Sequence, residues 1–256
     1  MNYSPADFYF SERFGYTYVS TAKVACSTIK HVMQRAESGP SQSSRDDSSS
    51  NPYGYSDFLL KVHDRNQSLL RWPANNDELH QFIGRSRRVF CLIRNPFTRV
   101  LSAYLDKIAA NLNRRRAFMA ELGVADVAPD DVVTFVDFLR LVRAQPVESM
   151  NGHWRPQYPH LSSYPMDYDL VGSFETLSAD LPKIFSEISP EILSFLENVD
   201  EHKTNAGELI SSYYDDESID LVRTIYRDDF DRLGYSDQAG NSHERSSIAV
   251  EEGLRK

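Results

Sequence analysis

The chain has 256 residues, 41% of them hydrophobic and 25% charged, and a formal net charge of −9. A chain of this kind can form one α/β domain with a sizeable core, or at most two small ones. The acidic balance argues against general nucleic-acid binding, which needs a basic face. No apolar run approaches the roughly 20 residues that cross a bilayer. The two cysteines, Cys26 and Cys91, suit a reducing compartment better than a disulfide framework.

The charges are divided unevenly along the chain. Residues 1–128 carry 17 Lys and Arg against 12 Asp and Glu, whereas residues 129–256 carry 11 against 25. Because opposite charges attract, we expect the first half to hold most of any anionic ligand.

The first strong pattern predicts a strand, a short loop and a helix. β-Branched and aromatic residues favour a strand over residues 16–20, and an apolar stripe with helical spacing begins at Ile29. The loop between them contains small residues and Lys23, with the hydroxyls of Ser27 and Thr28 at the helix start. Backbone N–H groups at a helix N-terminus, beside a lysine and hydroxyls, attract phosphate or sulfate. The glycines of the nucleotide-triphosphate P-loop are missing, so the pattern indicates another kind of anion site.

A serine-rich stretch, residues 38–52, then follows and is predicted to be mobile, either as a plain surface insertion or as a lid. A short helix is expected around residues 77–83.

The second strong pattern predicts another strand followed by a helix. The apolar run 89–93 is typical of a parallel strand covered on both faces, and Asn95 and Pro96 favour a helix start. Arg94 ends this strand, where open α/β sheets bind ligands, and Ser102 projects from the helix. An arginine with a hydroxyl partner clamps phosphate well. A surface ion pair for Arg94 and a solvent-facing Ser102 fit the spacing equally well.

The second half of the chain gives weaker signals. The arginine run 114–116 either faces solvent or contacts an anionic acceptor. A helix is predicted over residues 132–142, and the polar loop 151–157 carries a tryptophan that either stacks on a sugar or adenine or anchors the loop. Residues 168–177 predict a strand leading to a capped helix. We expect one last helix that ends at Gly234, and a disordered tail over residues 236–256.

Both strong patterns resemble nucleotide motifs of carbohydrate sulfotransferases of the chondroitin, dermatan and HNK-1 type, sulfotransferase family 2. Lys23-Val-Ala-Cys-Ser-Thr-Ile-Lys30 resembles the loop that holds the 5′-phosphosulfate of 3′-phosphoadenosine 5′-phosphosulfate (PAPS). Arg94-Asn-Pro-Phe-Thr-Arg-Val-Leu-Ser-Ala-Tyr104 is similar to the motif for its 3′-phosphate. The His-Trp-Arg-Pro segment and the closing helix are also similar, although the family's cysteine-containing segment has no cysteine here. The resemblance runs from about residue 16 to residue 235.

The resemblance implies a PAPS-dependent O-sulfotransferase that acts on a hydroxyl of a carbohydrate or polysaccharide. It implies that Arg94 and Ser102 hold the 3′-phosphate, and that the 5′-phosphosulfate is held by the loop residues Lys23, Val24, Ala25, Cys26, Ser27 and Thr28. Lys23 would also stabilise charge on the sulfuryl group during in-line transfer.

A general base should take the proton of the acceptor hydroxyl. The candidates are His63, His153 and, less favoured, His202, although each can equally be an ordinary surface histidine. His63 comes first because it lies between the two nucleotide motifs, as a catalytic histidine does in heparan-type 2-O-sulfotransferases; His153 would then position the acceptor. No metal is expected, because no histidines have ligand spacing.

We therefore predict a P-loop-like, three-layer α/β/α fold with a central, mostly parallel sheet, in a single domain over residues 1–235. The N-terminus lacks the basic and apolar regions of a signal peptide, so we expect a cytoplasmic, bacterial-like protein, with or without peripheral membrane contact. A Golgi location would apply to a chain trimmed of its anchor. Two alternatives remain open: a P-loop-like small-molecule kinase, and a non-catalytic nucleotide-binding protein.

Overall fold

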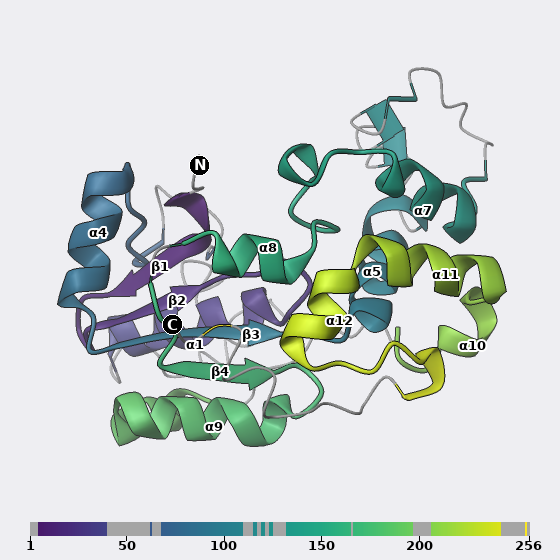
Figure 1. Ribbon diagram of the computed structural model, residues 1–256. Helices are drawn as coiled ribbons and strands as arrows, with labels where there is room; N and C mark the ends of the chain where they lie inside the picture. Colours follow the sequence, from purple (N-terminus) through teal and green to yellow (C-terminus); the bar gives the residue numbers. More distant parts are fainter. Residues whose placement is uncertain are drawn as a thin grey trace, which may run out of the picture. The chain divides into compact units, whose positions relative to one another are not determined.

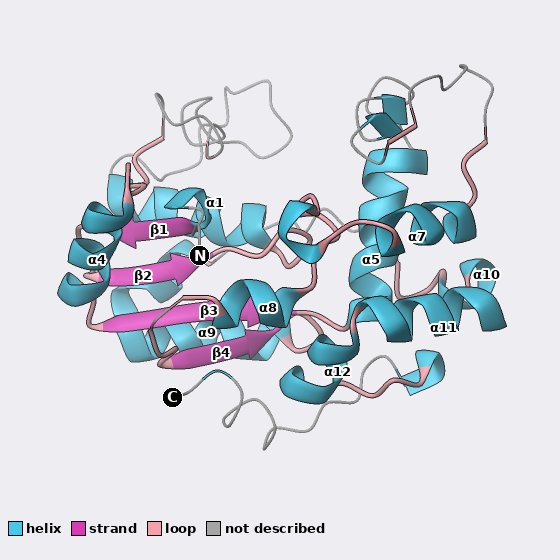
Figure 2. Cartoon of the chain, turned by 45° about the horizontal axis from the view of Figure 1, so that its top comes forward, coloured by secondary structure: helices cyan, strands magenta, loops and turns pink. Residues whose placement is uncertain are grey.

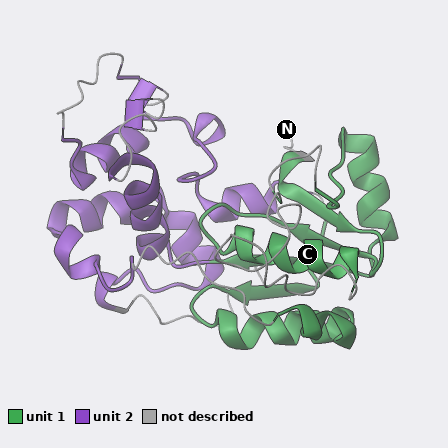
Figure 3. Cartoon of the chain, turned by 180° about the vertical axis from the view of Figure 1, so that it is seen from behind, with its two compact units in different colours: residues 1–93, 165–202 green, residues 94–164, 203–256 purple. Residues whose placement is uncertain are grey.

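The computed structural model describes residues 5–39, 62, 68–109, 115–116, 119–120, 123–124, 132–164, 166–196, 206–241 and 254. The chain divides into two compact units, which Figure 3 shows in different colours. Unit 1 comprises residues 1–93 and 165–202, and unit 2 comprises residues 94–164 and 203–256. The predicted single domain over residues 1–235 stays a prediction.

Unit 1 is built around a sheet that has four strands in the part of the chain described, in the order β1-β2-β3-β4 (Figures 1 and 2). Strands β2, β3 and β4 run parallel, and β1 pairs antiparallel with β2. The strands are β1 (Phe8–Ser11), β2 (Tyr16–Val19), β3 (Arg88–Ile93) and β4 (Leu170–Ser173). The mostly parallel sheet is therefore confirmed, whereas β1 has no counterpart among the predicted elements.

Helices cover both faces of this sheet. On one face, α1 (Cys26–Ser38) and α9 (Leu177–Ile188) share a buried core with the strands, formed by Tyr16, Tyr18, Phe90, Leu92, Ile29, Val32, Met33, Leu181 and Phe185. On the other face, Phe82 of α4 (Asn76–Arg85) stacks on Phe10 of β1, with ring centroids 4.9 Å apart. Adjacent residues of a strand point to opposite faces, so the two helical layers lie on opposite sides. The three-layer α/β/α fold is confirmed. Short 3₁₀ segments complete unit 1: η1 (Pro5–Asp7) and η4 (Pro190–Phe195).

Unit 2 is helical in its described residues. Its elements are α5 (Pro96–Tyr104), the π-helical η2 (Leu105–Ala109), α7 (Phe135–Arg143), η3 (Val147–Ser149), α8 (Gln157–Ser162), α10 (Ile210–Tyr213), α11 (Asp216–Ile225), α12 (Arg227–Leu233) and η5 (Ala239–Asn241). Every residue of α5 is buried, so this helix is the centre of the unit. Among the helices described in both units, none combines the length and the apolar character needed to span a bilayer.

The prediction of one last helix is wrong, because the helix is interrupted at Tyr226, between α11 and α12. Tyr226 leaves helical geometry there, with φ −110° and ψ 25°. Its ring is fully buried, and its hydroxyl donates a hydrogen bond to the backbone oxygen of Trp154 at 2.6 Å. A local apolar pattern does not register such a long-range contact. Gly234, left-handed at φ 72°, ends α12 as predicted.

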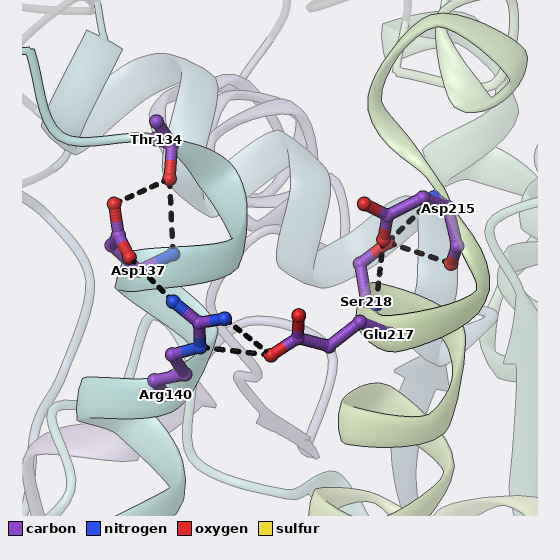
Figure 4. Close-up of polar contacts among 6 residues, drawn as sticks. All are labelled: Thr134, Asp137, Arg140, Asp215, Glu217 and Ser218. Carbon is purple, nitrogen blue, oxygen red and sulfur yellow. Dashed lines mark hydrogen bonds and ion pairs between the residues drawn. The ribbon is translucent and has the colours of Figure 1, made fainter.

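Side-chain caps define the starts of α7 and α11, which Figure 4 shows. Thr134 accepts a hydrogen bond from the backbone N–H of Asp137, and Asp215 and Ser218 form a reciprocal capping box. The capped start predicted for α9 is wrong, because the Thr176 hydroxyl donates to a carboxylate oxygen of Asp180 and accepts no backbone N–H.

Between α7 and α11, Arg140 forms an ion pair with Glu217, with Nη2 and Oε1 2.6 Å apart (Figure 4). Both side chains are about half exposed, so solvent screens this pair and it contributes little to stability.

Candidate functional site

The loop between β2 and α1 has an unusual backbone. Lys23 and Ala25 both adopt left-handed conformations, with φ 67° and 51°. Left-handed geometry costs residues other than glycine roughly 1–2 kcal/mol each, because Cβ approaches the following carbonyl oxygen. Val24, between them, is fully buried in the core of unit 1, which anchors the loop. Such conformations are found where the surrounding structure holds them, and often at functional sites.

The start of α1 suits an anion. Ala25 is its N-cap and makes no side-chain capping hydrogen bond, and the first turn contains no acidic residue. The first turn, Cys26, Ser27 and Thr28, combines N-terminal backbone amides with two hydroxyls. The helix macrodipole adds a partial positive charge at this end. The predicted strand, loop and helix are confirmed here, and Lys23 stands in the same loop.

Thr21 is a polar residue in this loop that the sequence patterns did not single out. Its side chain is buried, and its hydroxyl has no hydrogen-bond partner within the described residues. A buried hydroxyl without a partner costs about 1–3 kcal/mol, so it calls for an explanation such as a ligand oxygen. The sequence signal was only its place directly after the strand, where a threonine also fits as a β-branched residue.

Arg94 directly follows β3, and the helix after it begins as predicted. The side chain of Asn95 accepts a hydrogen bond from the N–H of Phe97 at 2.9 Å, and Pro96 occupies the first turn. Arg94 is only 6% exposed, and its Nε donates to the hydroxyl of Thr98 at 3.1 Å. Ser102, one turn further along α5, is also buried. The alternative of a surface ion pair for Arg94 and a solvent-facing Ser102 is therefore wrong.

The backbone of Arg94 is held by the side-chain amide of Gln157. Oε1 of Gln157 accepts from the Arg94 N–H at 2.9 Å, and Nε2 donates to the Arg94 carbonyl at 2.7 Å. Asp229 of α12 in turn accepts from the backbone N–H groups of Gln157 and Tyr158, at 2.9 and 2.7 Å. Burial raises the pKa of the Asp229 carboxyl, although these hydrogen bonds and the charge of Arg99 lower it. The sequence patterns assigned no role to Gln157 or Asp229.

The loop 151–155 is fixed from below by Arg99, which is almost fully buried. Its guanidinium donates to the carbonyls of Arg155 at 2.8 Å and Gly152 at 3.1 Å. His153 lies on this loop, with Nδ1 2.7 Å from Oδ1 of Asn151. This contact orients the ring.

Trp154 is fully buried, and its Nε1 donates to Oε1 of Gln145 at 3.1 Å. It therefore anchors the loop and does not present a stacking face.

Some predicted site residues lie outside the described part of the chain. These are His63, His202 and Arg114, together with most of the serine-rich stretch 38–52. Of the arginine run, Arg115 donates to the carbonyl of Ile108 at 2.9 Å and Arg116 is exposed. Of the three candidate bases, the structure therefore describes His153 alone.

The predicted residues fall into two groups. Lys23 and the start of α1 belong to unit 1, whereas Arg94, Ser102 and His153 belong to unit 2. The described residues contain no group of three His, Cys, Asp or Glu side chains that could hold a metal ion. Cys26 and Cys91 are both free thiols.

Comparison with known proteins gives a consistent set of relatives. The profile of the Sulfotransferase family matches residues 6–236. Human carbohydrate sulfotransferase 14 is 29% identical over 180 residues, which cover 68% of this chain and 44% of that protein. The zebrafish protein of the same name is 28% identical over 211 residues, 78% of this chain and 53% of that protein. Rat carbohydrate sulfotransferase 11 is 30% identical over 111 residues, 38% of this chain and 31% of that protein.

The chain therefore spans about half the length of the carbohydrate sulfotransferases 14 that it matches. No solved structure matches it at the significance shared by these relatives.

Proposed function

The chain belongs to the Sulfotransferase family, whose profile covers residues 6–236, and we propose that it transfers the sulfuryl group of PAPS to a hydroxyl of a carbohydrate. The names of its relatives, carbohydrate sulfotransferases 14 and 11, support the acceptor class. The observation that carries the proposal is the start of α1, which has no side-chain cap and no acidic residue and follows a strained loop with Lys23. A helix N-terminus of this kind favours a bound sulfate or phosphate group.

The residues present fit the 5′-phosphosulfate end of the nucleotide. The backbone amides of Cys26, Ser27 and Thr28 supply donors, and Lys23 supplies positive charge. Thr21 adds a buried hydroxyl that has no other partner within the described residues.

Arg94 and Ser102 are assigned to the 3′-phosphate. Strands β2 and β3 are parallel neighbours, with Val19 paired to Cys91, so their carboxyl ends lie at the same edge of the sheet. The Lys23 loop leaves that edge from β2, and Arg94 is the first residue after β3. Ligands of open α/β sheets bind at such edges. The order of the two family-like motifs along the chain supports one nucleotide bound at both ends.

The donor supplies an activated sulfuryl group on a phosphate leaving group. Lys23 and the first amides of α1 stabilise the negative charge that grows on the transferred and bridging oxygens. A sugar hydroxyl has a high pKa, so a base must take its proton as the new bond forms. We keep His63 as the first candidate for this base and assign His153, held by Asn151, to acceptor positioning.

The test is transfer of labelled sulfate from PAPS to a panel of polysaccharides, oligosaccharides, lipids and small alcohols. We expect label on a carbohydrate, with and without EDTA, because the proposed site uses lysine and backbone amides in place of a metal. Calorimetry with adenosine 3′,5′-bisphosphate and with ATP plus Mg²⁺ distinguishes the alternatives. Tight binding of the bisphosphate without transfer would indicate a non-catalytic protein, and a preference for ATP would indicate a kinase.

We also keep the cytoplasmic location as part of the proposal. Fractionation of cells that express the protein from its own gene tests it, and recovery with Golgi membranes would contradict it.

A further inference from the structure

The side-chain amide of Gln157 forms hydrogen bonds with both the N–H and the carbonyl of Arg94. It accepts from the Arg94 N–H at 2.9 Å and donates to the Arg94 carbonyl at 2.7 Å, and both residues are buried. Two hydrogen bonds from one planar group fix both the position and the rotation of the backbone they bind. Arg94 is thereby fixed at the point from which its side chain leaves the chain.

Asp229 sets the orientation of that amide. Its Oδ2 accepts from Gln157 Nε2 at 3.2 Å and from the Gln157 backbone N–H at 2.9 Å. The two partners of Nε2, a carboxylate and a carbonyl, are both acceptors, so the amide cannot be turned over without losing its contacts. The second carboxylate oxygen accepts from the N–H of Tyr158 at 2.7 Å. Asp229 itself is fully buried, so its hydrogen bonds to Gln157 and Tyr158 are shielded from solvent.

The side chain of Arg94 is restrained as well as its backbone. Nε donates to the hydroxyl of Thr98, in the first turn of α5, at 3.1 Å. With the peptide held by Gln157 and Nε held by Thr98, the direction of the guanidinium is set before any ligand contacts it. Donors that are already fixed in place bind anions more tightly than mobile ones, because less conformational entropy is lost on binding.

We propose that Gln157 and Asp229 are positioning residues that aim Arg94 at the 3′-phosphate and so set the preference of the protein for 3′-phosphorylated nucleotides. The proposal rests on the assignment of Arg94 under the proposed function. It gives the segment that follows His153 and the closing helix α12 a role in nucleotide recognition, although Gln157 and Asp229 are 72 residues apart.

The test measures, by calorimetry, the affinities of the wild-type protein and of Gln157→Met for adenosine 3′,5′-bisphosphate and for adenosine 5′-phosphate. Methionine has a similar volume but can form neither bond to Arg94. We expect Gln157→Met to lower the preference for the bisphosphate about tenfold, the equivalent of one to two net hydrogen bonds, with affinity for the monophosphate nearly unchanged. Arg94→Ala should abolish the preference and marks the full effect. Asp229→Asn, which leaves Gln157 in place, should lower it to an intermediate value.

Ser218→Ala is the matched control for a purely structural effect. Ser218 is buried in the same unit and stabilises the start of α11, without a contact to Arg94. It should lower the melting temperature and keep the nucleotide preference. The proposal is overturned if folded Gln157→Met or Asp229→Asn keeps the wild-type preference, or if Ser218→Ala loses as much. A wild-type protein that binds both nucleotides equally would instead contradict the proposed function of Arg94.

Discussion

A negative charge placed in the first turn of α1 should stabilise the protein and weaken nucleotide binding. Ser27 is the second residue of α1, where the helix has no side-chain cap and no acidic residue. In Ser27→Asp the carboxylate would interact with the helix dipole, which adds about 0.3–1 kcal/mol of stability. For a domain of this size, that gain raises the melting temperature by roughly 1–4 °C.

The same carboxylate would meet the 5′-phosphate of the nucleotide. Two like charges about 4 Å apart near a protein surface repel by about 4 kcal/mol, and Lys23 offsets part of this. We therefore expect the affinity for adenosine 3′,5′-bisphosphate to fall by about 100-fold or more, measured by calorimetry beside thermal unfolding.

Ser178→Asp is the control, because Ser178 is exposed and is the second residue of α9, which also lacks a side-chain cap. It should gain at most as much stability and bind the nucleotide as the wild type does. Wild-type affinity in Ser27→Asp would refute the assignment of this helix start to the 5′-phosphate. An equal loss of nucleotide affinity in both variants would show that the added negative charge, and not its position, causes the effect.

Three further predictions address the fold, pH dependence and catalysis. Gly172→Ala should lower the free energy of unfolding by about 1–3 kcal/mol, because the new methyl group would overlap Leu92. Gly84→Ala, in open space on α4, should raise it by up to about 1 kcal/mol, and equal effects of the two variants in chemical unfolding would contradict this packing. Burial raises the pKa of the Glu37 carboxyl above 4.5, so its ionisation disfavours the folded state. The free energy of unfolding of the wild type, relative to that of Glu37→Gln, should therefore fall as pH rises above 4.5, and a difference between the two proteins that stays constant with pH would refute the shift. His63→Ala should abolish sulfate transfer while nucleotide binding is kept, and unchanged transfer would remove His63 from the role of base.

The two strand–loop–helix blocks could be predicted because their signals are local. A run of β-branched or apolar residues marks each strand, and the pair Asn95 and Pro96 marks the start of α5. Strand β1 was not predicted although three of its four residues are aromatic and favour a strand, since four residues have little room for a periodic pattern.

The parts that escaped prediction depend on contacts between distant residues. Arg99 is charged, yet it is almost fully buried and its guanidinium donates to backbone carbonyls of the loop 151–155. Gln157 and Asp229 look like ordinary polar residues until the fold joins them. The break at Tyr226 likewise follows from its hydrogen bond to Trp154. Buried polar residues of this kind need partners, and the sequence does not say which.

The left-handed residues of the Lys23 loop bear on how such sites are found in other proteins. Glycine adopts positive φ without steric cost, so phosphate-binding loops are usually searched for by glycine spacing. Here lysine and alanine occupy such positions, with φ 67° and 51°, and the buried Val24 lies between them. A search by residue identity passes over a loop of this type, whereas a search by backbone dihedral angles would retain it. The transferable signature is therefore the order of φ values between strand and helix, which different residue types can supply.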